Sequence, residues 1–300
     1  MSNAINTPRA LALGFFDGVH SAHRAVLASA RAAADRHGCM AAAVTFDRHP
    51  AAALSGAPQQ LIQTLSDRVA SIRREGGMDD CIVLRFDDAL RDMEAEDFIE
   101  EILLGKLQAV SVSVGYDHRF GRGGRGDAQL LRRVLAGHGV ECHVVERMDF
   151  ATEPVASGTV RRLIAEGDVD TARRILGKPF GFSGEVIHGK GLGHTLGFPT
   201  MNVPMPEELV TPPAGVYTSR VTVEGKVYRA VTNVDRERLS ETFVFDFDSS
   251  VYGHNIRVEL LSYRRAMRKF EGWDVLTQQI EQDKKEARAW FEEQEEMNAL

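Results

Sequence analysis

The sequence predicts an α/β domain built on a parallel sheet, followed by an antiparallel β-barrel domain that ends in a helix. Three observations lead to this expectation. The chain has 300 residues, 43% of them hydrophobic, which is enough for about two domains with buried cores. Up to about Leu176, short apolar runs alternate with helical patterns, as in parallel sheets whose strands are buried on both faces. After Pro179, apolar and polar residues alternate between glycine-rich turns, as in antiparallel strands.

In the first half, these patterns predict an order of strands and helices. The apolar run at 11–16 predicts a strand, and the alanine-rich stretch at 23–38 predicts a helix that ends at Gly38. The alternation continues with expected strands at 40–46, 81–86, 110–116 and 141–148, and expected helices at 65–77, 96–107 and 128–139. A helical stretch at 158–177 closes this half, so we expect domains at 1–178 and 179–300.

In the second half, the alternation has a period of two residues. The clearest local signal is the segment "VEGKVY" at 223–228, where a Glu-Gly pair between β-prone residues predicts a hairpin. The expected strands lie at 182–189, 215–234, 241–247 and 255–265. A final helix is expected from about Trp273 to Gln294.

The composition argues against several classes of protein. The net charge of −7 and the isoelectric point near 5.8 do not suit a general nucleic-acid binder, which is normally basic. The three cysteines are far apart, so we expect reduced thiols, with no zinc site and no disulfide framework. No uncharged apolar stretch reaches about 18 residues, and Asp17 interrupts the N-terminal apolar run. We therefore expect a cytoplasmic protein without membrane or nucleic-acid partners; the oligomeric state stays open.

Two histidines stand where the first strand gives way to the first helix. Gly14 and Gly18 allow tight turns after the strand, and His20 and His23 fall on one side of the first helical turn. At the carboxyl end of a parallel strand, beside a helix N-terminus, such histidines can donate hydrogen bonds to phosphate oxygens. A pair of histidines at this spacing, taken alone, is more often an ordinary capping or surface pair.

Several further segments, taken together with these histidines, resemble the motifs of one protein family. "GFFDGVHSAH" resembles the (H/T)xGH signature of the nucleotidylyltransferase superfamily, "VTFDRHP" is similar to TFxPHP, and "VGYDHRFGRGGRGDAQLL" is similar to GxDFRFGxxxxGd. "VASGTVRRLIAEGDVDTARRILGKPF" resembles the SSTxIR helix and its continuation, and in the second half "GEVIHGKGLGHTLGFPTMNV" is similar to GxVxxGxxxGRxLGFPTAN. With three more blocks near the C-terminus, nearly the whole chain resembles the prokaryotic bifunctional riboflavin kinase/FMN adenylyltransferase (FAD synthetase) family.

This resemblance implies a Rossmann-like nucleotidylyltransferase domain that transfers the adenylyl group of ATP to FMN, giving FAD and pyrophosphate. The implied catalytic residues of this domain are His20, His23 and Arg161. The implied nucleotide- and phosphate-binding residues are Gly14, Phe16, Asp17, Gly18, Ser157 and Thr159. The residues implied to face the flavin and its phosphate are Asp117, Phe120, Arg122 and Arg125, with Arg119 in the same basic loop.

For the second half, the resemblance implies a riboflavin kinase barrel that uses ATP with Mg²⁺. Thr200 and Asn202 would hold the metal-nucleotide, and a hydroxyl and an amide oxygen are suitable hard ligands. Glu241 would be the base that takes the proton of the ribityl 5'-hydroxyl. The implied phosphate-binding glycines are Gly189, Gly191 and Gly193, and the implied flavin-binding residues are Arg265 and Phe270.

The sequence departs from the family pattern in both halves. A Gly-x-x-Pro-Thr turn that the family carries between Asn233 and Glu241 is missing after Val234. The other departures are Ala22, Ala156, Gly158, His194 and Met267. Three readings therefore remain open: a bifunctional enzyme, a divergent paralogue that binds flavin or nucleotide with little turnover, and a cytidylyltransferase with another phosphorylated substrate. The last leaves the second domain without a role.

Overall fold

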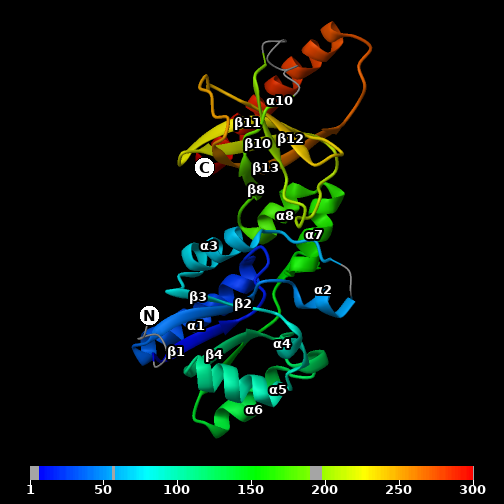
Figure 1. Ribbon diagram of the computed structural model, residues 1–300. Helices are drawn as coiled ribbons and strands as arrows, with labels where there is room; N and C mark the ends of the chain where they lie inside the picture. Colours follow the sequence, from blue (N-terminus) through cyan, green and yellow to red (C-terminus); the bar gives the residue numbers. More distant parts are fainter. Residues whose placement is uncertain (1–6, 56–57, 190–197, 300) are drawn as a thin grey trace. The chain divides into compact units, whose positions relative to one another are not determined.

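The computed structural model of the protein describes residues 7–55, 58–189 and 198–299 (Figure 1). The chain forms two compact units, Met1–Thr159 and Val160–Leu300. None of the helices described has the length and apolar content that a membrane crossing requires.

The first unit is built on a five-stranded sheet in which every pair of neighbours is parallel. Its strands, in the sheet order β3-β2-β1-β4-β5, are Asp80–Leu84, Met40–Phe46, Arg9–Leu13, Ala109–Gly115 and Glu141–Val145. Buried side chains cover both faces: Leu11 and Leu13 join one apolar cluster, whereas Ala10 and Ala12 join another. The parallel α/β sheet expected from the sequence is therefore confirmed.

In the described residues before position 140, helices form at the four places that the sequence predicts, and two further short helices and a 3₁₀ turn form that it did not predict. The helices are α1 (Ser21–His37), α2 (Pro50–Ser55), α3 (Leu65–Gly76), α4 (Asp88–Asp92), α5 (Ala95–Asp97), the π-helix η1 (Phe98–Lys106), the 3₁₀ turn η2 (Arg122–Gly124) and α6 (Ala128–Gly137). Two short strands, β6 (Asp149–Phe150) and β7 (Glu153–Pro154), form a separate hairpin. The long helix α1 ends at Gly38, whose φ of +60° is the left-handed conformation that glycine adopts without strain, so this expected end is confirmed.

The helical stretch expected at 158–177 forms two helices, α7 (Ser157–Glu166) and α8 (Val169–Leu176). They separate at Gly167, which has a φ of +88° and lies against the ring of Pro213. The Asp168 carboxylate then caps α8 by accepting a hydrogen bond from the Thr171 amide (3.0 Å). Because α8 packs on strands β8 (Phe180–Glu185) and β13 (Asn255–Ala266), it belongs to the second compact unit.

The second unit contains a six-stranded antiparallel sheet of order β8-β13-β10-β11-β12-β9. The remaining strands are β9 (Thr200–Pro204), β10 (Gly215–Val223), β11 (Lys226–Val234) and β12 (Leu239–Val244). A bridge between Ile187 and Asn202 joins the end of β8 to β9, so that the two outer strands meet and the sheet curls into the expected barrel. The β10–β11 connection turns at Glu224 and Gly225, both with positive φ, which confirms the predicted hairpin.

The final helix, α10 (Trp273–Ala299), is longer than the sequence suggested (Figure 1). It packs on β10 and β11, where Ala287 meets the buried side chains of Val216, Val231 and Phe245. The helix therefore covers part of the barrel and supplies one wall of the cavity described below.

Candidate active sites

The loop between β1 and α1 has an unusual backbone. Phe16 and Val19 have φ values of +59° and +48°, and Gly18 has a φ of +85°. Left-handed conformations at bulky residues are costly, and they cluster at sites where a loop must take one particular shape. A side chain at Gly14 would put its Cβ 3.0 Å from the ring of Phe16, so this ring, only 1% exposed, would have to shift to admit it.

His20 and His23 lie next to each other at the start of α1. His20 is the N-cap residue, and its Nδ1 accepts a hydrogen bond from the His23 backbone amide (3.3 Å). The two rings stack with 3.6 Å between their centroids, and the Phe16 ring meets His23 edge-on at 5.3 Å. Ala22 is inside the helix, where a methyl group is well tolerated. Two histidines at the positive end of a helix, beside the carboxyl end of β1, form an arrangement suited to an anionic ligand.

Asp17 is buried and anchors the same loop. Its Oδ1 accepts hydrogen bonds from the backbone amides of Ile62 (2.9 Å) and Gln63 (3.2 Å). Its carbonyl oxygen accepts one from the Ser157 hydroxyl at the start of α7 (2.9 Å). The structure thus joins Asp17 and Ser157, two of the expected nucleotide-binding residues, and directs the Asp17 carboxylate toward backbone amides. Thr159 follows on α7 and is buried.

Arg68, which no motif of the sequence singled out, is completely buried next to this loop. Its guanidinium lies 3.9 Å from the centroid of the Phe15 ring, and its Nη2 donates a hydrogen bond to the Phe46 carbonyl (2.5 Å). Burial lowers the pKa of Arg68 to about 10, while the charges of Asp17 and Asp47 act in the opposite direction. The signal in the sequence was an arginine at helical spacing from the buried Ile72. Arg68 links the ends of β1 and β2.

The basic loop after β4 has one buried aromatic ring and several exposed cationic side chains. Phe120 is buried, with its ring 5.7 Å from Phe98 and 5.8 Å from His118, and a Cβ at Gly126 would lie 2.7 Å from it. The ring therefore supports the loop from within the core. Asp117 is exposed and precedes His118 in the chain.

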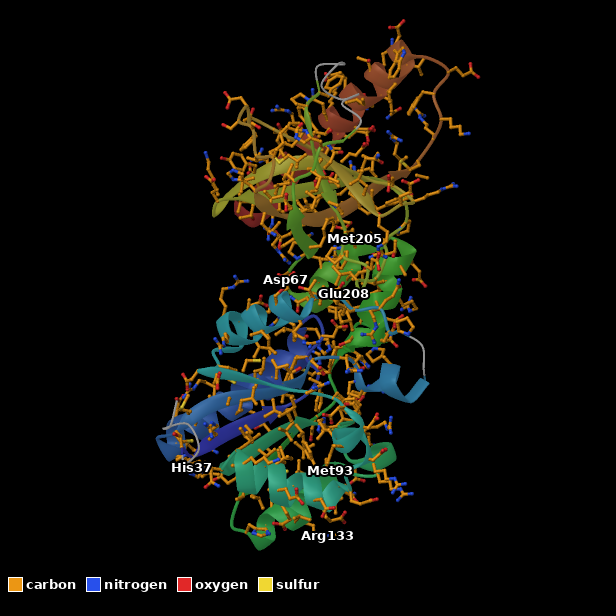
Figure 2. All side chains as sticks on the ribbon, in the orientation of Figure 1. His37, Asp67, Met93, Arg133, Met205 and Glu208 are labelled. Atoms are coloured by element: carbon orange, nitrogen blue, oxygen red, sulfur yellow. The ribbon has the colours of Figure 1, made fainter. Side chains whose placement is uncertain are left out.

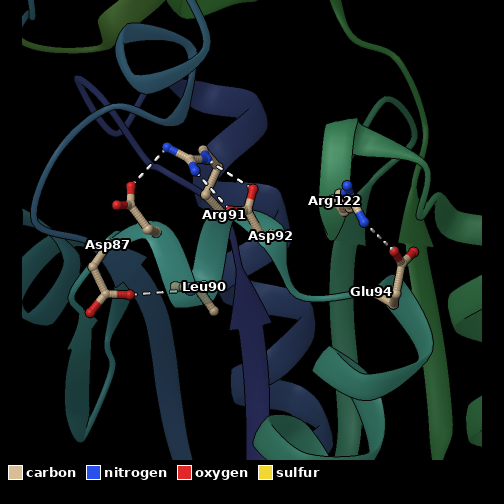
Figure 3. Close-up of polar contacts among 7 residues, drawn as sticks. Asp87, Leu90, Arg91, Asp92, Glu94 and Arg122 are labelled. Carbon is tan, nitrogen blue, oxygen red and sulfur yellow. Dashed lines mark hydrogen bonds and ion pairs between the residues drawn. The ribbon is translucent and has the colours of Figure 1, made fainter.

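Three arginines of the loop contact acidic residues. Nη1 atoms of Arg122 and Arg125 lie 3.4 Å and 3.9 Å from the carboxylate of Glu94, as Figure 3 shows for Arg122. The backbone amide of Arg122 also donates to the carbonyl of Met93 (2.7 Å), which follows α4 in the chain and is labelled in Figure 2. Arg119 lies 3.6 Å from Asp127. These are exposed pairs, which contribute little to stability and exchange easily for another anion.

In the second unit, a cavity of about 400 Å³ gathers most of the residues expected there from the sequence. These are Gly189, Thr200, Asn202, Glu241, Arg265 and Phe270. The cavity is completed by residues that the sequence did not single out, among them His188, Phe198, Asn233, Phe243, Tyr252, Arg268, Asp283 and Lys284. Gly191, Gly193 and His194 lie outside the described residues.

Three polar side chains form a row across the cavity wall. Asn233 of β11 pairs with Glu241 of β12, and Glu241 pairs with Asn202 of β9. The Asn233 amide donates to a Glu241 carboxylate oxygen (3.4 Å), so the carboxylate stands between two amides. A Cβ at Gly189 would lie 2.5 Å from the Asn202 amide nitrogen, and this close approach requires a glycine.

The row leaves acceptor oxygens without partners. Oδ1 of Asn202 is buried and has no hydrogen-bond donor in the described part of the chain, and Thr200 precedes it by two residues on the same strand. The described ranges contain no cluster of three or more His, Cys, Asp or Glu side chains able to hold a metal ion. An amide oxygen and a hydroxyl fit a Mg²⁺ ion whose remaining ligands come from the phosphates of a nucleotide.

Residues of α10 also line the cavity. Nε and Nη2 of Arg265 donate to the two carboxylate oxygens of Asp283 (2.9 Å and 2.6 Å), and Gln279 donates to the same carboxylate (2.7 Å). The Arg265 guanidinium also lies 5.9 Å from the centroid of the Phe270 ring. Arg265 thus joins β13 to α10. The sequence signal for Asp283 was its helical spacing from Ile280 and Ala287.

An ordered turn occupies the place of the missing Gly-x-x-Pro-Thr segment. Oδ1 of Asp235 accepts hydrogen bonds from the amides of Glu237 (2.9 Å) and Leu239 (2.8 Å). Nη2 of Arg238, a residue with a φ of +66°, donates to the carbonyls of Pro206 (2.6 Å) and Leu209 (2.9 Å). This turn keeps β11 and β12 in the register that joins Asn233 to Glu241.

Each half of the chain matches a known protein family. Residues 2–159 match the family model described as FAD synthetase, and residues 176–291 match the one described as riboflavin kinase. The bifunctional riboflavin kinase/FMN adenylyltransferase of Bacillus subtilis is 34% identical over 94% of this chain and 92% of its own length. The Haemophilus influenzae protein of the same name is 32% identical over 94% of both chains.

A solved structure is similar to this chain over both units. It is described as a macrolide-efflux protein from Streptococcus pneumoniae, is 26% identical, and superposes with a TM-score of 0.85 over 97% of this chain and 98% of that one. The full-length sequence matches and the two family models agree with the resemblance seen in the motifs. The chain belongs to the bifunctional riboflavin kinase/FMN adenylyltransferase family.

Proposed function

We propose that this protein phosphorylates riboflavin to FMN in its second unit and adenylylates FMN to FAD, with release of pyrophosphate, in its first. The observation that carries the proposal is the row of Asn233, Glu241 and Asn202 in a cavity, in a chain whose two halves match the two enzyme families. The cavity is lined by the carboxylate of Glu241, by the side chains of Thr200 and Asn202, whose oxygens suit Mg²⁺, and by Gly189, and this set is suited to phosphoryl transfer.

In the kinase reaction, the Glu241 carboxylate takes the proton of the ribityl 5'-hydroxyl while that oxygen attacks the γ-phosphorus of ATP. The bond from this phosphorus to the bridging oxygen breaks, and ADP leaves. The Asn233 amide orients the carboxylate. Thr200 and Asn202 would hold the Mg²⁺ of the nucleotide, which neutralises phosphate charge when it is bound. Arg265 and Phe270 close the flavin side.

In the adenylyl transfer, a phosphate oxygen of FMN attacks the α-phosphorus of ATP, and the bond to the bridging oxygen breaks to release pyrophosphate. His20 and His23 donate hydrogen bonds to the phosphates, with Arg161, Ser157 and Thr159 supplied by α7. The implied nucleotide-binding loop is Gly14, Phe16, Asp17 and Gly18. No protein nucleophile is required, because positioning and charge neutralisation lower the barrier.

The basic loop after β4 would receive the flavin and phosphate of FMN. In this proposal Arg122 and Arg125 exchange Glu94 for the FMN phosphate, and Asp117 faces the flavin from the loop surface. Phe120 supports the loop from below. For function, we assign α7 and α8 to the first domain and keep the boundary at 178.

The proposal includes a cytoplasmic location without nucleic-acid partners. It is supported by the net charge of −7 and by the three free cysteines, Cys39, Cys81 and Cys142.

A second candidate is a divergent paralogue that binds flavin and nucleotide with little turnover. The altered turn at Asp235–Arg238 favours it, because the family carries a longer turn at the flavin end of the kinase cavity. Ala156 and Gly158, which replace hydroxyl residues at the start of α7, favour it in the first unit.

Incubation of the purified protein with Mg-ATP and either riboflavin or FMN tests both candidates. Chromatography of the flavins scores each half separately, and we expect FMN from riboflavin and FAD from FMN. Calorimetric binding of ATP without either product would support the paralogue. Absence of both binding and product would contradict both candidates.

A further inference from the structure

Lys284 of α10 enters the kinase cavity beside two aromatic rings. Its Nζ lies 4.7 Å from the ring centroid of Phe198 and 4.6 Å from that of Phe243, and both rings line the cavity. The Lys284 side chain is only 18% exposed. An ammonium group held against two rings is partly stripped of water, although it is normally strongly hydrated.

The charge of Lys284 has a weak anionic partner. Its Nζ lies 3.0 Å from Oε1 of Glu281, one turn earlier on the helix, whose side chain is 56% exposed. Exposed pairs of this kind are easily exchanged. By contrast, Arg265 donates two hydrogen bonds to the buried Asp283, and Arg268 lies over Phe270 and donates to Gln279. Lys284 thus differs from Arg265 in having an exposed anionic partner, and from Arg268 in being largely buried against two rings.

The register of the barrel places Lys284 on the nucleotide side of the cavity. In the β12–β9 pairing, Phe243 stands opposite Thr200, and Glu241 stands opposite Asn202. Phe198 precedes Thr200 by two residues. Both rings that flank the ammonium therefore border Thr200, the expected metal-nucleotide ligand.

We propose that Lys284 is a further catalytic residue of the kinase cavity, whose ammonium contacts phosphate oxygens of the ATP bound at Thr200 and Asn202. This proposal rests on the proposed kinase function. The rings and α10 hold a compact positive charge where a transferring phosphoryl group spreads negative charge over its oxygens, and lysine acts on phosphate as a point charge. On nucleotide binding, the ammonium exchanges Glu281 for phosphate.

The test compares Lys284→Met with Lys284→Arg and with a matched control, Lys285→Met. Lys285 is the next residue, is exposed and does not line the cavity. Kinase assays with riboflavin give kcat and the KM for ATP; calorimetry gives the Kd for Mg-ADP, and flavin fluorescence gives the Kd for riboflavin. Methionine keeps an apolar stem against the rings, and a thermal melt verifies that each variant is folded.

We expect Lys284→Met to weaken Mg-ADP binding and to raise the KM for ATP about tenfold or more, the loss typical of a charged hydrogen bond. Lys284→Arg should retain most of the affinity, Lys285→Met should behave as the parent protein, and riboflavin binding should change less than about twofold in all three. Equal nucleotide affinity in Lys284→Met and the parent protein would overturn the proposal, as would a loss confined to riboflavin. Failure of the parent protein to phosphorylate riboflavin counts against the proposed function instead, and the Mg-ADP comparison still tests Lys284.

Discussion

At the scale of single residues, burial decides the protonation of His118. Its ring stacks on Phe120 in the first unit, and burial lowers its pKa to about 4 although the nearby Asp117 charge acts in the opposite direction. An unfolded histidine has a pKa of about 6.5. The unfolded chain therefore binds more protons than the folded one between these two values.

This difference predicts that the first unit loses stability as the pH falls from about 6.5 toward 4. The stability is complete above the unfolded pKa and decreases below it, because protonation favours the unfolded chain. Denaturant unfolding at pH 7 and pH 5 measures the loss. His118→Phe keeps an aromatic ring in the stack and should show a smaller loss over this interval; an equal loss would contradict the role of His118. The carboxylate of Glu141, whose hydrogen bonds from His143 and Arg36 lower its pKa from 4.5 to about 2, loses its contribution to stability between these two values, below the pH 5 of this measurement.

Gly189 offers a second test of a single position. A Cβ there would lie 2.5 Å from the Asn202 amide nitrogen, so Gly189→Ala should displace that amide from the cavity wall. We expect FMN formation to fall about tenfold or more, since a ligand of the metal-nucleotide is misplaced. Gly272→Ala is the control, because a Cβ at Gly272 meets open space. Normal riboflavin phosphorylation by Gly189→Ala would remove the role assigned to Asn202.

At the scale of elements, the turn between β11 and β12 depends on Arg238. Its guanidinium contacts Pro206, Leu209 and the Thr211 hydroxyl, and it thereby ties the turn to the segment after β9. Glu241 and Asn233 lie on the two strands that this turn joins. The position of the proposed base therefore depends on a contact outside the cavity.

Arg238→Ala should lower the free energy of unfolding of the second unit by about 1–3 kcal/mol, because it removes hydrogen bonds from a charged donor. Kinase activity should decrease as well, whereas FAD formation from FMN should not. Arg236→Ala, at an exposed position of the same turn, should change stability by less than about 0.5 kcal/mol. Denaturant titration of both variants measures the difference, and equal losses would show that Arg238 does not hold the turn.

At the scale of the whole molecule, the two proposed reactions use separate groups of residues, one before and one after the proposed boundary at 178. His23→Ala should abolish FAD formation, because one of the two stacked histidines at the start of α1 is lost, and should leave FMN formation intact. Glu241→Gln and Asn202→Ala should do the reverse. Assays of both reactions on each purified variant measure this separation.

Two outcomes of these assays would contradict the assignment. Unchanged FAD synthesis by His23→Ala would remove the role of that histidine, and normal riboflavin phosphorylation by Glu241→Gln would show that another group accepts the proton. The parent protein, assayed in parallel, provides the reference for both reactions.

Much of the molecule was predictable because its signals are local. The period of the apolar residues predicted the parallel and antiparallel halves, and Gly38 predicted the end of α1. The motifs around His23 and Asn202 predicted the family that the comparisons confirm. The break at Gly167 was not predicted, since the surrounding helical pattern continues through an isolated glycine.

The amino-acid sequence by itself determined the two fold classes, the order of the elements and the family. Periodicity, helix caps and motifs depend only on residues that are close together in the chain. Only the tertiary structure decided that Phe120 and the Asp17 carboxylate are buried, that Asn233 stands beside Glu241, and that Lys284 enters the kinase cavity. Strand register and the docking of α10 join residues far apart in the chain. Such contacts depend on how whole surfaces pack together, and this packing cannot be predicted from any short segment of the sequence.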